Sequence, residues 1–313
     1  MSGTNMRSVF IGMLLVAILF FLAESSNGQE PKVRAKRGGK PWSAELAPGN
    51  SLAAHSWWPP NVDEAAPSIA PGVPCALGDV LQGAGQRVAE LVTNLEQFTA
   101  TERVEHSELN RKGNWAPPRA RSFKYLVSIS EIRPGMLNVE ENRNGGQSLD
   151  AFPTRLATIG LAASALIFHP YYVGDFEMAC EGLGEWRGQP AWLVRFQQRS
   201  DKLPRIHVFR VGGGIFPVKQ KGRAWISFGA YQILRLVLDL VEPVPKIRLK
   251  TEHEEIEYGP VEFRNRKAQL WLPESADLYM DFRGHGYHHR HSFSDFLLFS
   301  VEATQEIQAP KEP

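Results

Sequence analysis

Cysteine is scarce in this sequence, with 2 among 313 residues. Two cysteines are too few for a disulfide-rich scaffold or an all-cysteine zinc site. A surplus of one charge is also absent, because 35 Lys and Arg balance 34 Asp and Glu. Phosphate binding needs a basic surplus, so the net charge gives no reason to expect nucleic acid as a partner. With 43% hydrophobic and 22% charged residues, most of the chain can bury a core.

Catalytic motifs are missing as well. The nucleophile elbow and the Walker phosphate loop do not occur, and Gly83-Ala84-Gly85 lies within a predicted helix. The zinc-protease pattern fails, because His253-Glu254 lacks the second His at the required spacing. Glu140-Glu141 and Glu254-Glu255 point to opposite faces of a strand, so we expect them to be solvated. The sequence therefore predicts no enzyme and no cofactor, with a hydrolase whose cleft escapes sequence analysis as the third alternative.

The N-terminus has the pattern of an export signal. Arg7 precedes Val9–Ala23, an uncharged apolar run of 15 residues. A membrane-spanning helix needs about 20. The run therefore predicts a secretory signal peptide at residues 1–28, cleaved after Gly28. An uncleaved anchor in the inner membrane is the alternative. We expect a periplasmic or secreted protein.

Export changes the interpretation of Cys75 and Cys180. In an oxidising compartment an isolated pair is more often a structural disulfide than a redox or metal site. The bridge would close a loop of about a hundred residues, a contribution on the order of 4 kcal/mol in the chain-entropy model. Two separate buried thiols are the alternative.

Residues 29–74 have the composition of a linker. Prolines recur along them, and no window has helix or strand periodicity. Basic residues gather at the start, with no acid before Glu45. We expect a solvated tail, with an arm that touches anionic lipid headgroups as the alternative. Trp42, Trp57 and Trp58 give the tail a means of docking on the folded domain, which we place at residues 75–310.

Two segments predict helices. Apolar residues at spacings of three and four give Leu77–Leu95 an amphipathic stripe, and Leu156–Phe168 is apolar nearly all round. Most of the remaining domain alternates with period two, as in Phe123–Ile129, and Asn144-Gly145 is typical of a tight hairpin. Further strands are predicted at Phe176–Gly184, Ala191–Gln198, Ile206–Val211, Gly222–Phe228, Gln232–Val241, Lys246–Tyr258, Ala268–Leu272, Leu278–Phe282 and Phe293–Ala303.

Two of these strands are apolar on both faces. In Gln232–Val241, leucines at even positions oppose Ile233 and Val237, and Phe293–Val301 has a similar pattern. An antiparallel sheet with one wet face does not have such strands. Both faces of the central strands must therefore be covered, by helices and a sheet that curls on itself or by an apolar cavity.

The stretch His285–His291 contains the one chemical cluster, with four histidines. On a strand, His289 and His291 would project from the same face, which is a real metal-ligand geometry. Arg283 and Arg290 would repel a cation there. A pH-sensitive surface is a further alternative. We favour a solvated hairpin tip, and therefore predict no metal.

Several stretches resemble known proteins. A signal, then a helix that runs into Phe98–Glu102, then a long meander resembles the periplasmic lipoprotein-carrier superfamily, of which LolA and LolB are members. Gly222–Arg235 looks like the strand–turn–strand of that superfamily. A group of exported bacterial proteins of unknown function is similar at Cys180–Gly182, Lys221–Trp225, Glu257–Val261 and Leu270–Pro273.

The resemblance implies a single α+β domain: a strongly curved antiparallel half-barrel of about ten strands, with two or three helices on its concave face. Carriers of this superfamily hold acyl chains on that face. The resemblance therefore implies a non-enzymatic envelope protein that binds lipid, lipoprotein acyl chains or another apolar ligand. Unlike LolB, this chain has no cysteine for acylation at the predicted mature N-terminus.

The alternative function is a periplasmic protein–protein interaction module with a packed core and no ligand. We expect a monomer in either case. The candidate residues for lining an apolar site are Trp192, Val194, Phe196, Trp225, Leu236 and Trp271.

Overall fold

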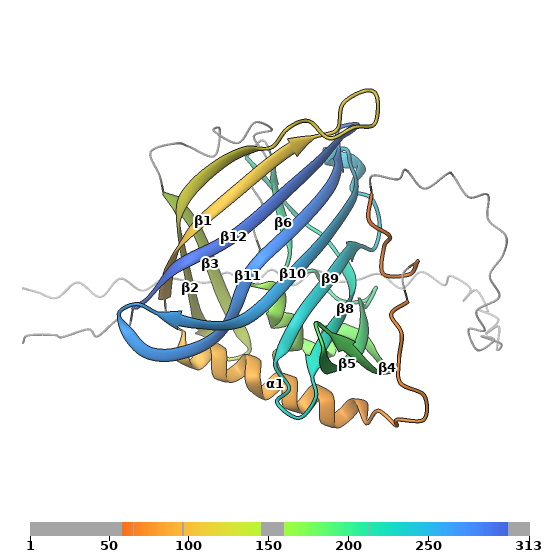
Figure 1. Cartoon of the computed structure of the whole chain (residues 1–313), viewed down its shortest axis with the longest axis vertical. Coiled ribbons are helices and arrows are strands. Elements are labelled where there is room, and N and C mark those ends of the chain that lie inside the picture. The colour runs from red at the N-terminus through yellow and green to blue at the C-terminus, as the bar shows by residue number, and fades with distance from the viewer. Residues whose placement is uncertain (1–57, 65, 96, 145–159, 212, 300–313) are drawn as a thin grey trace, which may run out of the picture. The chain divides into compact units, whose positions relative to one another are not determined.

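The computed structural model describes residues 58–299 except 65, 96, 145–159 and 212 (Figure 1). The predicted signal peptide, most of the predicted linker and Gly145 of the predicted hairpin lie outside these residues. The described residues belong to one compact unit. The domain boundaries at residues 28 and 74 stay predictions. No helix in the described part of the chain is long and apolar enough to span a membrane.

Ten antiparallel strands form one sheet, in the order β3-β2-β1-β12-β11-β10-β9-β8-β5-β4. Their bounds are β1 Gln97–Glu108, β2 Arg119–Arg133, β3 Met136–Asn144, β4 Phe176–Trp186, β5 Gln189–Gln198, β8 Gln220–Ser227, β9 Ile233–Leu240, β10 Leu249–Phe263, β11 Arg266–Phe282 and β12 His285–Phe299. A separate hairpin joins β6 (Val208–Val211) to β7 (Gly214–Pro217). Most neighbours in the sheet are also neighbours in the sequence, as the predicted meander requires.

Several strands differ from the sequence prediction, β1, β11 and β12 most clearly. β1 was not among the predicted strands, because inward-facing Glu102 and His106 interrupt its apolar alternation. The predicted strands Ala268–Leu272 and Leu278–Phe282 are one strand, β11, which continues through Pro273 at a shift in its register with β10. β12 begins at His285, eight residues before the predicted start at Phe293.

The described residues contain one α-helix, α1 (Leu77–Asn94), at the predicted position. The second predicted helix is wrong as far as it is described, because residues 160–168 form a turn and the five-residue 3₁₀ helix η2 (Ser164–Phe168). Gly160 has a φ of 114°, which a right-handed helix does not allow. Two further 3₁₀ turns are η3 (Val173–Asp175) and η4 (Pro245–Ile247). The helix count is therefore lower than predicted.

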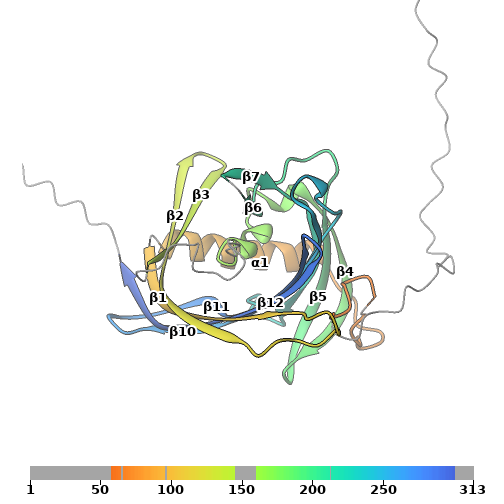
Figure 2. The ribbon, with the colours of Figure 1, turned by 90° about the horizontal axis from the view of Figure 1, so that it is seen from above.

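α1 and η2 lie on one face of the sheet, called the inner face below (Figure 2). The sheet bends around them but is not closed, because β3 and β4 end it. The strong curvature predicted for the half-barrel is not found. Side chains of α1 and η2 pack on the inner side with those of β5 and β8–β11.

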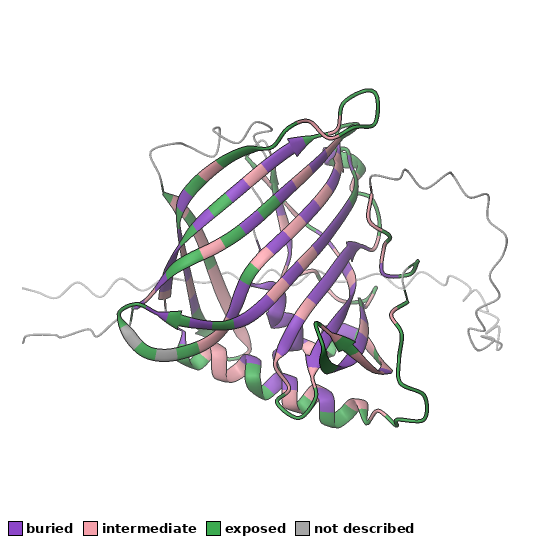
Figure 3. Cartoon of the chain, viewed as in Figure 1, coloured by how far each residue is buried: buried purple, intermediate pink, exposed green. Residues whose placement is uncertain are grey.

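Both faces of β9 are covered, as predicted for this two-faced apolar strand, whereas the outer positions of β12 are largely exposed. In β9, Leu236 packs in the main apolar core of the inner face, and Val237 packs on the outer face against Val62. Val62 also donates its N–H to Oδ2 of Asp239 at 2.8 Å. Buried and exposed residues alternate along the long strands (Figure 3). In β2 this buries the predicted face, Phe123–Ile129.

Candidate functional site

A disulfide anchors the start of α1. Cys75, two residues before the helix, is bonded to Cys180 of β4, as predicted. Because β4 is an end strand of the sheet, the bond ties the helix to that end. It crosslinks residues 105 positions apart in the chain.

The turn between β8 and β9 holds the middle of α1. A Cβ on Gly83 would lie 2.4 Å from the ring of Tyr231, so only glycine lets the turn approach the helix this closely. Arg87 donates from Nε to the carbonyl oxygen of Ala230 at 3.1 Å. These contacts explain a helix glycine that would otherwise destabilise α1 by about 1 kcal/mol.

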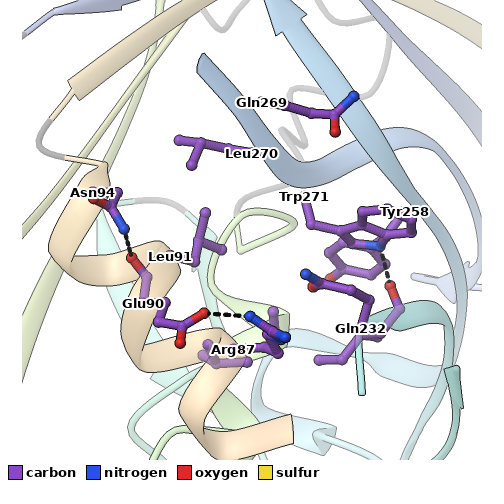
Figure 4. A pocket seen from close by; sticks show the side chains of 12 residues that line it. Arg87, Glu90, Leu91, Asn94, Gln232, Tyr258, Gln269, Leu270 and Trp271 are labelled. Atoms are coloured by element: carbon purple, nitrogen blue, oxygen red, sulfur yellow. Dashed lines mark hydrogen bonds and ion pairs between the residues drawn. The ribbon is translucent and has the colours of Figure 1, made fainter. Parts of the chain in front are cut away.

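The C-terminal half of α1 borders a cavity of about 210 Å³ on the inner face (Figure 4). Its apolar wall consists of Val88, Leu91, Ala165, Ile233, Leu270 and Trp271. The other lining residues are Arg87, Glu90, Asn94, Gln232, Tyr258 and Gln269. Trp271 donates from Nε1 to the carbonyl oxygen of Ile233 at 2.6 Å, which holds its ring in the wall (Figure 4). The cavity thus combines an apolar wall with polar side chains.

The six predicted lining residues do not surround one space. Four of them, Trp192, Val194, Phe196 and Leu236, are buried in the main apolar core of the inner face. Trp225 is buried on the outer face against Val62. Trp271 alone lines the cavity. Sequence periodicity does not separate the two faces, because both are apolar.

The inner face also buries ionisable side chains. Glu102 on β1 and Arg143 on β3 form an ion pair, with Nη2 and Oε1 2.8 Å apart. His291 on β12 lies with its Nδ1 2.8 Å from the same oxygen. Burial by itself raises the pKa of Glu102, but the charge of Arg143 and the hydrogen bond with His291 outweigh it and lower the pKa to about 2. Glu102 is therefore a buried carboxylate that stays ionised.

His289 and His291 are both fully buried on the inner face of β12. They share one face, as predicted, but they do not form a solvated hairpin tip. Nε2 of His289 lies 2.8 Å from Nδ1 of His106, whereas His291 contacts Glu102. The two imidazoles therefore have separate partners. Of the four histidines, His285 is the exposed one.

Replacing His289 by Gln should change how stability depends on pH. Burial, with His291 and His106 nearby, lowers the pKa of His289 well below its usual value. The unfolded chain takes up this proton near pH 6.5, so the folded state loses stability as pH falls below 6.5, by at most about 1.4 kcal/mol per pH unit. Urea unfolding at pH 7.5, 6.5 and 5.5 should give a smaller loss for His289→Gln. Equal slopes for His289→Gln and the wild type would contradict the prediction.

A second polar cluster joins β10 to the residue before β6. Nε2 of His207 lies 3.1 Å from Oε2 of Glu252 and 3.7 Å from Oε1 of Glu254. His207 is 4% exposed, Glu252 3% and Glu254 1%. Among the described residues, these three form the one group of histidine, cysteine or acidic side chains arranged to hold a metal ion.

Charge determines the protonation of this cluster. Burial and the neighbouring Glu252 raise the pKa of Glu254 to about 8. Burial lowers the pKa of His207, but the two carboxylates outweigh it and raise the pKa to about 9. The expectation that Glu254-Glu255 is a solvated pair is wrong for Glu254, although the two side chains do point to opposite faces. The sequence contained one indication of this cluster, because Glu252 and Glu254 are two residues apart on a predicted strand and so share a face. It contained no indication that His207 lies beside them.

Comparison with known proteins gives a distant fold likeness. No family model matches the sequence, and no curated protein matches it. One similar solved structure is a DUF1329 family protein from Desulfovibrio piger, with a TM-score of 0.41 and 11% identity over 73% of this chain and 95% of that chain. Another is described as a putative outer membrane lipoprotein-sorting protein domain from Vibrio parahaemolyticus, with a TM-score of 0.39 and 10% identity over 72% of this chain and 94% of that chain. A LolA superfamily protein from Nitrosomonas europaea is also similar (0.35, 11%, 73% and 96%). These neighbours fit the distant resemblance found in the sequence. The function below is argued from this chain's own residues.

Proposed function

We propose that this protein is a non-enzymatic carrier that binds an acyl chain or another apolar ligand between α1 and the sheet. The observation that carries the proposal is the cavity beside the C-terminal half of α1. Leu91, Leu270 and Trp271 offer apolar contact, and Arg87 and Gln269 offer polar contact in the same space. An amphiphile has both needs: its chain leaves water, and its polar end keeps hydrogen-bonding partners.

The size of the cavity favours a chain end over a whole lipid. Ligand pockets usually enclose about 300–1,000 Å³, and this one measures about 210 Å³. A longer chain requires α1 to move outward at its C-terminal half. That half carries Leu91 and Val92, which are only partly buried, whereas the disulfide and the Tyr231 contact hold the other half. The C-terminal half of α1 is therefore the half that we expect to move.

Export is part of the proposal. Disulfides persist in oxidising compartments, and Cys75–Cys180 is one. The apolar run Val9–Ala23 supplies the sequence signal for export. The ligand would then be a lipid or a lipoprotein acyl chain of the cell envelope.

Native mass spectrometry of gently extracted protein, followed by titration with a fluorescent fatty acid, tests the proposal. We expect a co-purified adduct of lipid mass and saturable binding of the fatty acid. Leu91→Trp should fill the cavity and weaken binding at least tenfold. Thr93→Trp changes an exposed position of α1 and should bind as the wild type does. A clean protein mass together with no uptake of fatty acid would contradict the proposal.

A protein–protein interaction module is the second candidate. It is favoured by the packing beneath η2, where the rings of Phe168 and Phe196 meet edge to face with centroids 5.8 Å apart. Side chains fill that part of the inner face, so it has no room for a ligand. The same mass spectrum separates the candidates, because an interaction module would co-purify with protein rather than with lipid.

A further inference from the structure

Two carboxylates and one imidazole meet in the interior, on the inner face of β10. Glu252 and Glu254 are two residues apart on this strand, so their side chains point the same way. His207 approaches them from the segment before β6. All three are at least nine-tenths buried. Nothing in the proposed carrier function uses them.

The cluster lacks the hydrogen bonds that such burial requires. Neither carboxylate oxygen of Glu254 has a hydrogen-bond partner in the described part of the chain, and neither does the hydroxyl of Tyr258. Glu141 lies nearby, but its Oε1 accepts the N–H of Gly160 at 3.0 Å and its carboxyl group interacts with Tyr125, so it is not part of this group. An unsatisfied buried polar group costs about 1–3 kcal/mol, and more when charged. A metal ion bound here would take the place of the proton on His207 and give Glu254 a partner.

The spacing of the three side chains fits a metal ion. Ligand atoms at about 2.0 Å from a tetrahedral zinc ion lie about 3.3 Å from one another. The two distances from Nε2 of His207 to the carboxylates, 3.1 and 3.7 Å, bracket that value. All three ligand atoms lie within 4.8 Å of one another.

We propose that His207, Glu252 and Glu254 bind one divalent transition-metal ion, with zinc as the ion that fits best. Imidazole nitrogen favours zinc over calcium and magnesium, which prefer oxygen ligands alone. The two carboxylates neutralise the charge of the ion. The ion in turn gives Glu254 the partner that it lacks. Three protein ligands leave a fourth position for water or for a ligand atom. A Cβ on Gly160 would lie 3.0 Å from Nδ1 of His207, so glycine at this position gives the imidazole room.

Equilibrium binding of Zn²⁺ to the full-length, disulfide-bonded protein tests this proposal. The protein is dialysed against chelator, transferred to buffer and titrated by calorimetry, and the protein as purified is analysed for metal by mass spectrometry. We expect one Zn²⁺ per chain. Glu254→Gln and His207→Gln should each weaken the affinity at least 100-fold. Glu255→Gln removes the neighbouring carboxylate on the outer face and should bind zinc as the wild type does.

Thermal unfolding separates loss of the site from loss of the fold. Zn²⁺ should raise the Tm of the wild type and of Glu255→Gln by several degrees, and it should leave the Tm of Glu254→Gln unchanged. Without metal, Glu254→Gln should have a Tm close to that of the wild type, because Gln has the shape of the uncharged carboxyl group that burial favours at this position. No zinc binding by the wild type, or equal affinity in all four proteins, would overturn the proposal. So would binding of Ca²⁺ in preference to Zn²⁺.

Discussion

Replacing Arg143 by Met is expected to lower the free energy of unfolding by about 3–5 kcal/mol. The side chain of Arg143 is 3% exposed and that of its partner Glu102 is fully buried. The substitution removes the cation but leaves a carboxylate whose side chain is fully buried. The hydrogen bond from His291 remains, yet it cannot replace a full positive charge. Urea unfolding at pH 7 measures the loss.

Two variants make this result specific. Arg103→Met removes an arginine of β1 whose ion pair with Glu105 is exposed, with 51% of the arginine side chain accessible, so we expect a loss below about 1 kcal/mol. Adding Glu102→Gln to Arg143→Met should restore part of the stability, because no unpaired charge then remains. An Arg143→Met protein as stable as Arg103→Met would show that the pair does not stabilise the fold.

The double variant Cys75→Ala/Cys180→Ala is expected to lose about 4–5 kcal/mol of unfolding free energy. A crosslink between residues 105 positions apart removes a large part of the entropy of the unfolded chain. Urea unfolding with and without a reducing agent measures the effect. The reducing agent should destabilise the wild type by a similar amount and leave the double variant unchanged. Equal stability of the two oxidised proteins would contradict the expectation.

The same disulfide connects stability to the proposed carrier function. It fixes the N-terminal end of α1 to β4, while the cavity lies beside the other half of the helix. Without the bond, the N-terminal end of α1 is held by its packing and by the contact with Tyr231, but not by a covalent link. We therefore infer that the disulfide limits how far the cavity opens, and that it keeps the proposed movement local.

Periodicity predicted those parts of the fold in which hydrophobicity alone decides burial. The amphipathic stripe of α1 and the buried face Phe123–Ile129 of β2 are both apolar on the protected side. Both elements were therefore found at the expected place. Glu102 and His289 lie on protected faces as well, but they are polar. A pattern of hydrophobic residues assigns such positions to solvent, and it concealed β1 and the start of β12.

Side-chain identity did not indicate which residues would meet. Trp225 on β8 and Trp271 on β11 are both tryptophans of the sheet, yet the first is buried on the outer face and the second lines the cavity. The direction of each depends on register and on irregularities such as the one between Trp225 and Ile226. A one-residue shift reverses every following side chain, so composition cannot supply this information.

The two cysteines show where sequence reasoning was sufficient. Their scarcity left a single possible intramolecular disulfide, and the disulfide between Cys75 and Cys180 is present. By itself the sequence also determined an antiparallel meander and the burial of β9 on both faces, because short connections favour antiparallel neighbours and β9 is apolar on both sides. Only the tertiary structure decided that Glu102 has Arg143 as a partner and that His207 reaches Glu252 and Glu254. Contacts between residues distant in the chain depend on how the sheet bends and on what fills its inner face, and neither property is local.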